Sequence, residues 1–104
     1  MNRSKEIVNL IESEFKGIKF SETAEDKVSC HFSKKVIHKG KEVECKIRIE
    51  YNYLIILLVD TTILLSIDAF SPNKDIIHRL YEKLPIEIYL AEHREKIINE
   101  ILGN

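Results

Sequence analysis

Four histidines are the first residues to consider for metal chemistry: His31, His38, His78 and His93. A zinc site needs three or four converging ligands, usually with a closely spaced pair among them. His78 and Glu82 stand one turn apart on a predicted helix, which suits a shared metal, but no third ligand lies nearby in the sequence. We therefore predict no metal site and no cofactor.

The two cysteines are not placed for nucleophilic catalysis. Cys30 and His31 are neighbours in an alternating segment, so their side chains point to opposite faces of a strand and cannot act together. Cys30 and Cys45 are too few for a disulfide framework. Both lie among alternating apolar residues, where a reduced cysteine behaves as a small hydrophobe.

No catalytic motif was found, and the chain is expected not to be an enzyme. The glycines are isolated, so no glycine-rich phosphate loop exists. An unusual small enzyme is the third hypothesis, and His78, Glu82 and His93 are the first residues to test for it.

Charge is distributed unevenly along the 104 residues, although the net charge is only −1. Residues 27–48 hold seven basic and two acidic groups, whereas the segments on both sides are acidic overall. Six of these basic residues are predicted to contact a partner: Lys34, Lys35, Lys39, Lys41, Lys46 and Arg48. Lysine on an exposed strand also discourages edge-to-edge pairing, so a solvated edge is the alternative interpretation.

The basic segment itself reads as a β-hairpin over Val28 to Tyr51. A two-residue turn at Lys39-Gly40 pairs residues whose numbers sum to 79. That register places Phe32 beside Ile47, and likewise Cys30 beside Ile49 and Val36 beside Val43, all on one face. It also sets Lys35 opposite Glu44 on the other face. A slip by one residue would turn every apolar side chain outward, so the pattern favours this register.

Helices are predicted before and after the strands in the sequence. The first runs from about Arg3 to Lys16, with Asn2 or Ser4 as its cap and Gly17 as the left-handed residue after its end. Residues 21–26 read as a loop. A second helix starts at Ser71-Pro72 and ends before Pro85. A last helix is expected over about 87–102, and a short edge strand at 86–90 is the alternative.

Two further strands, Leu54 to Val59 and Ile63 to Ala69, complete the predicted sheet. The first of them is apolar on both faces, which implies that something covers the second face too. The cover is either one of the chain's own helices or a second molecule. For the second case we predict a self-association face and a homodimer through Ile55, Leu57, Val59 and Leu64.

The fold class predicted from this order is α+β, with an N-terminal helix, a four-stranded antiparallel meander and two C-terminal helices. The length suits a single domain, 1–104. No signal peptide is recognised and no apolar run reaches the ~20 residues that span a membrane, so a cytoplasmic location is expected.

A chain of this kind most often works by contact. The leading hypothesis is a non-enzymatic protein-binding domain, an adaptor or an inhibitor that occludes an acidic partner. Because Lys, Ile, Asn and Glu are abundant, as in low-GC bacteria and their phages, a phage-encoded inhibitor of a host defence system is one instance. The alternative is nucleic-acid binding through the basic hairpin 27–48. Stacking aromatics, which single-strand binders usually supply, are missing from its outer face.

Overall fold

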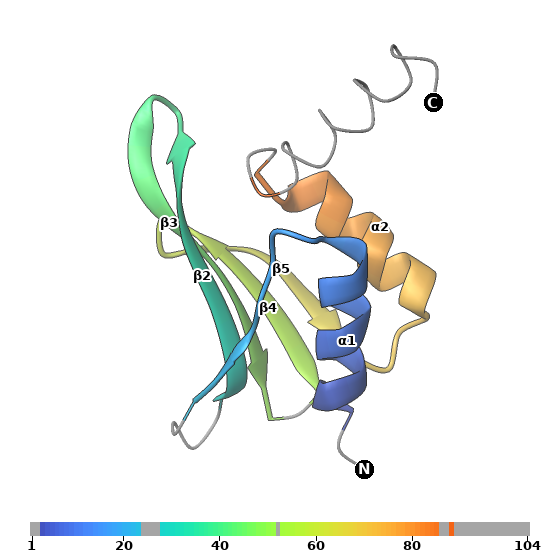
Figure 1. Ribbon diagram of the computed structural model, residues 1–104. Coiled ribbons are helices and arrows are strands. Elements are labelled where there is room, and N and C mark those ends of the chain that lie inside the picture. The colour runs from blue at the N-terminus through green and yellow to red at the C-terminus, as the bar shows by residue number, and fades with distance from the viewer. Residues whose placement is uncertain (1–2, 24–27, 52, 86–87, 89–104) are drawn as a thin grey trace, which may run out of the picture.

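Five antiparallel strands and two helices form the described part of the chain, residues 3–23, 28–51, 53–85 and 88 of the computed structural model (Figure 1). Along the chain they are α1 (Ser4–Glu14), β1 (Ser21–Glu22), β2 (Val28–His38), β3 (Lys41–Glu50), β4 (Leu54–Val59), β5 (Thr62–Asp68) and α2 (Asn73–Lys83). The strands follow one another across the sheet in the order β1-β2-β3-β4-β5. The α+β class and the antiparallel meander are confirmed. The sheet has five strands, because Ser21–Glu22 pairs with β2 where a loop was predicted.

The β2–β3 hairpin has the predicted register. Lys35 pairs with Glu44 and Phe32 with Ile47, as the turn at Lys39-Gly40 requires. Both turn residues have positive φ, 54° and 76°, which matches the right-handed twist of the strands that they join. The register shifts only at the start of β2, between Val28 and Cys30.

The β4–β5 hairpin turns at Asp60 and Thr61, which also have positive φ, 52° and 63°. The bounds of β4 are those predicted, and β5 starts one residue earlier than expected. A bulge lies in β5 opposite Leu57 and Leu58, so the pairing is regular from Leu65 to Asp68.

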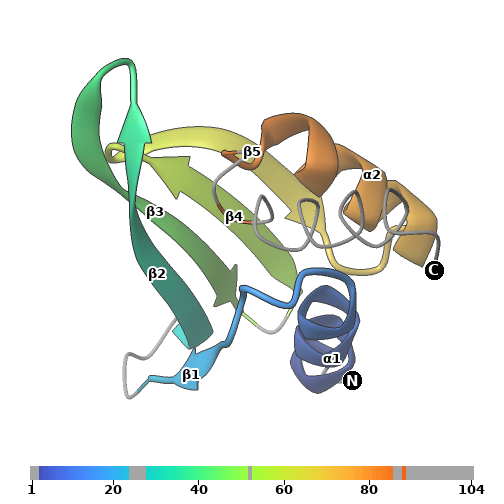
Figure 2. The ribbon, with the colours of Figure 1, turned by 45° about the horizontal axis from the view of Figure 1, so that its top comes forward.

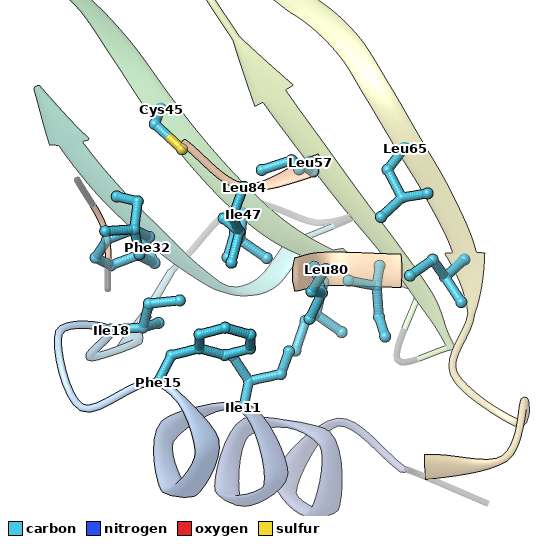
Figure 3. Close-up of a cluster of buried hydrophobic side chains, with 14 of the residues drawn as sticks. Ile11, Phe15, Ile18, Phe32, Cys45, Ile47, Leu57, Leu65, Leu80 and Leu84 are labelled. Atoms are coloured by element: carbon cyan, nitrogen blue, oxygen red, sulfur yellow. The ribbon is translucent and has the colours of Figure 1, made fainter. Parts of the chain in front are cut away.

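Both described helices lie on the same face of the sheet (Figure 2). The core between them and the sheet includes Ile11 of α1, Phe15 just after α1, Leu80 of α2, and Ile47 and Leu57 of the strands, all fully buried (Figure 3). On the opposite face, the described part of the chain places no helix. We call this second side the open face.

The first helix is held at its start by Arg3, a residue that the sequence patterns did not single out. Its guanidinium donates hydrogen bonds to the backbone oxygen of Ala69, to Glu6 and, at 2.8 Å, to Oδ1 of Asn73. It also lies 5.9 Å from the centre of the Phe70 ring. Arg3 thus ties α1 to the connection between β5 and α2. The predicted cap at Ser4 is wrong, because Arg3 takes the N-cap position without a side-chain cap.

Gly17 has a different role from the predicted left-handed cap. The helix ends at Glu14 with an extended Phe15, and Gly17 does not have positive φ. A Cβ at position 17 would instead lie 2.6 Å from the backbone oxygen of Ile88. The glycine is therefore needed for the close approach of two backbone segments.

The second helix begins slightly later than expected. Pro72 is its N-cap residue without a side-chain cap, so Ser71 does not cap it. The helix ends at Lys83, before Pro85 as predicted. The last predicted helix, 87–102, and most of the alternative strand at 86–90 lie outside the described residues; Ile88 is buried.

Candidate interface on the open face of the sheet

The six basic residues predicted to contact a partner do not share one surface. The register puts Lys35, Lys46 and Arg48 on the open face. Lys34 and Lys41 pair with Cys45 and His38 and so belong to the opposite face. The turn end of this hairpin extends beyond the helices (Figure 1). Lys39 lies in the turn.

Acidic groups compensate much of the positive charge of the hairpin. Lys46 lies 3.3 Å from Glu44, and Arg48 lies 3.3 Å from Glu50. Lys41 lies 3.7 Å from Asp60. These pairs are exposed and individually weak, so they orient the cations more than they stabilise the fold.

Glu44 is the most strongly engaged of these acids. The Ser33 hydroxyl donates a 2.7 Å hydrogen bond to its Oε1. That hydrogen bond, followed by the one from Lys46, holds the pKa of the Glu44 carboxyl below its ordinary value. Glu44 is therefore a fixed negative charge in the middle of the predicted basic surface.

A hollow of about 280 Å³ opens on this face beside Glu44. Its cationic and polar wall is formed by His31, Ser33, Lys46 and Arg48. Val28, which is 3% exposed, contributes the apolar part. Three basic side chains and the Glu44 carboxylate thus line the hollow next to a buried aliphatic side chain, and Lys46 and Arg48 are each within 3.3 Å of an acid.

An aliphatic strip adjoins the cationic row on the same face. Leu54, Ile56 and Leu58 alternate with the core residues of β4, and Ile63 of β5 pairs with Leu58. Ile56 is buried between its cross-strand neighbours Arg48 and Ser66, whereas Ile63 is 60% exposed. The open face therefore combines a charged half on β2 and β3 with an apolar half on β4 and β5.

The predicted self-association face was assigned to the wrong side of β4. Ile55, Leu57 and Val59 are at most 2% exposed and face α1 and α2 in the core. The reason is the β3–β4 register, which pairs Ile55 with Ile49 and thereby continues the apolar face of the hairpin. Of the four residues, only Leu64 is exposed.

The candidate catalytic residues are not brought together in the described structure. His78 and Glu82 form an exposed pair on α2, with 2.6 Å between Nε2 and Oε1. Among the described residues no group of three potential ligands is placed to hold a metal. His93 lies outside the described residues.

Cys30 and His31 point to opposite faces, as predicted. Cys30 is buried with the core, while His31 lines the hollow on the open face. Burial, with smaller contributions from Glu12 and Glu22, raises the pKa of the Cys30 thiol to about 11. At neutral pH the sulfur is therefore a protonated thiol and a poor nucleophile.

In comparisons with known proteins, no family model, no curated protein and no solved structure matches this chain. In the described part of the chain, neither helix has the length and apolar character needed to cross a membrane.

Proposed function

We propose that this chain is a non-enzymatic protein-binding domain, an adaptor or inhibitor that contacts its partner through the open face. The observation that carries the proposal is the aliphatic strip beside the hollow. An interface typically combines an apolar centre with a polar rim, and this face provides both side by side. Ile63 would lie at the apolar centre, with Lys46 and Arg48 on the rim.

The charge of the hollow indicates the chemistry of the partner. A carboxylate entering it meets His31, Lys46 and Arg48, and it would compete with Glu44 for Lys46. A partner surface with an acidic side chain next to exposed aliphatic groups is complementary to both halves of the face. We therefore expect an acidic protein as partner.

Variants of the two halves test this proposal. Wild type, Arg48→Glu and Leu58→Asp would be immobilised and the proteins captured from a cell extract quantified, with Lys74→Glu on α2 as the matched control. We expect a partner that binds wild type and Lys74→Glu and is lost with both open-face variants. A partner retained by Arg48→Glu and Leu58→Asp, or lost with Lys74→Glu, would contradict the assignment of the interface.

Oligonucleotide binding is the competing function that the same surface must be tested for. Fluorescence anisotropy at about 50 and about 200 mM salt reveals phosphate contacts, because counterion release makes such binding strongly salt-dependent. We expect no binding, since Phe32, the only Phe, Tyr or Trp of β2 and β3, is buried and cannot stack on bases. Salt-sensitive binding that disappears in the triple variant Lys35→Glu, Lys39→Glu, Lys46→Glu would replace the protein-binding proposal.

A further inference from the structure

The outer edge of β5 is a second surface, which adjoins the open face at Ile63. Strand β5 is at one end of the sheet order, and β4 is its only strand neighbour in the described structure. The Ala69 N–H donates to the Tyr53 oxygen across this ladder. Every second residue of an antiparallel strand hydrogen-bonds with the same neighbour, so the backbone groups of Ile67 and Leu65, like those of Ala69, point toward β4. The N–H groups of Ser66 and Asp68 point away from the sheet.

The side chains of this edge lack the usual features that prevent strand pairing. Thr62–Asp68 contains no lysine, no arginine and no proline, and its single charged residue is Asp68 at the end. Ile63 and Leu64 are exposed at 60% and 38%. The bulge disturbs the first half of the strand but leaves Leu65 to Asp68 regular. The Ser71 N–H already donates to the Asp68 oxygen, so among the described residues the outward groups left for pairing are the N–H and C=O of Ser66 and the N–H of Asp68. Backbone groups of this kind beside exposed aliphatic side chains can accept another β-strand.

We infer that this occupant is β5 of a second copy of the chain, paired antiparallel about a two-fold axis. Such pairing is self-complementary: each copy offers the same strand length, the same outward N–H groups and the same exposed aliphatic residues. The strand contains only one charged residue, Asp68 at its end, so like-charge repulsion between the two copies is small.

The opposite edge of the sheet, formed by β1, favours a closed dimer over an open filament. Strand β1 has only two residues, both exposed, and one of them is the acidic Glu22. If β5 paired head to tail with the two-residue strand β1, most of the outward backbone groups of β5 would stay unsatisfied. Pairing of β5 with β5 uses the better edge of both copies and produces a dimer, not a filament. This dimer does not depend on the partner proposed for the open face.

The test is the mass in solution as a function of concentration. The regular part of the edge is short, so the interface belongs to the small, weak class and requires measurements from about 5 to about 500 µM. By sedimentation equilibrium we expect the wild-type mass to rise from one chain to two over this range. Amide hydrogen exchange of Ser66 and Asp68 is expected to slow in the same range.

Two edge variants and one control make the assignment specific. Ser66→Pro removes an outward N–H without removing a hydrogen bond to β4, and Leu64→Lys adds a charge at the edge. Both are expected to remain monomeric, whereas Ile37→Lys, an exposed position at the distal end of β2, is expected to dimerise like wild type. If Ser66→Pro fails to fold by circular dichroism, Leu64→Lys decides. A monomeric wild type, a mass that continues to rise beyond two chains, or an edge variant that dimerises normally would overturn the inference.

Discussion

At the scale of single residues, the environment of a side chain decides its chemistry more than its type does. Glu44 is an acid within a basic hairpin, and its hydrogen bonds from Ser33 and Lys46 favour its ionised form, which lowers the net positive charge of the hairpin. Cys30 is a potential nucleophile, but burial keeps its thiol protonated. The charge of Glu44 argues against a uniformly basic surface for nucleic acid, and the protonated thiol argues against nucleophilic catalysis by Cys30.

The buried thiol of Cys30 predicts a specific loss of stability at alkaline pH. Its pKa rises from 9.0 to about 11 on folding, so the native state holds the proton more tightly than the unfolded chain. The stabilisation is complete below pH 9.0 and is lost as the pH rises through about 11. Between about pH 8 and about pH 10.5, wild type should lose about 1–2 kcal/mol more of its free energy of unfolding than Cys30→Ala.

Urea unfolding of both proteins at the two pH values measures this difference. The other titrating groups are common to both, so their contributions cancel. An equal loss of the free energy of unfolding in wild type and Cys30→Ala would mean that folding does not raise the pKa of the Cys30 thiol.

At the scale of elements, contacts between distant segments hold the helices on the sheet. Arg3 joins the start of α1 to Ala69 and Asn73, and Tyr81 of α2 packs against Phe15, just after α1, in a tilted arrangement with ring centres 4.6 Å apart. Gly17 allows the segment after α1 to approach the backbone of Ile88. These contacts join residues far apart in the sequence, so no local pattern announces them.

Gly17→Ala is predicted to destabilise the protein through this close approach. The new Cβ would lie 2.6 Å from a backbone oxygen, which has no flexible end that can move aside. We expect a loss of about 1–3 kcal/mol in the free energy of unfolding, typical of overpacking. Lys19→Ala, at a nearby exposed position, should change it by less than about 0.5 kcal/mol in the same urea titration. A Gly17→Ala variant as stable as wild type would show that the two segments do not pack this closely.

At the scale of the whole molecule, the described structure is two-layered, with both helices on one face of a five-stranded sheet. The layering makes the two sides of β4 unequal, although both are aliphatic. One side is core and the other is the apolar half of the open face. This difference in burial between the two sides of β4 supports a contact function for the open face. It can be measured as a difference in the stability of variants.

Adjacent leucines of β4 provide that measurement. Leu57 is fully buried under the helices, whereas Leu58 is half-buried on the open face. Leu57→Ala should cost about 2–5 kcal/mol of the free energy of unfolding, because it leaves a cavity in the core. Leu58→Ala should cost less than half as much when both are compared by urea unfolding of dilute, monomeric protein. Equal costs would mean that the second face is covered as well as the first.

The sequence by itself determined the features that depend on neighbouring residues. Strict alternation and the Lys39-Gly40 turn led to the correct β2–β3 register, because a slip by one residue would expose every apolar side chain of the hairpin. The polar face with His31, Lys46 and Arg48 followed from the same pattern. The bounds of β4 followed from its aliphatic run.

Only the tertiary structure decided which face of β4 is buried. Residues Leu54–Val59 are apolar throughout, so no alternation distinguishes Ile55 and Leu57 from Ile56 and Leu58; their side is set by pairing with β3 and by helices from both ends of the chain. The bonds of Arg3 and the approach of Gly17 to Ile88 were likewise invisible in the sequence. Local periodicity encodes strands and turns, whereas burial of one face against another depends on contacts between residues far apart in the chain.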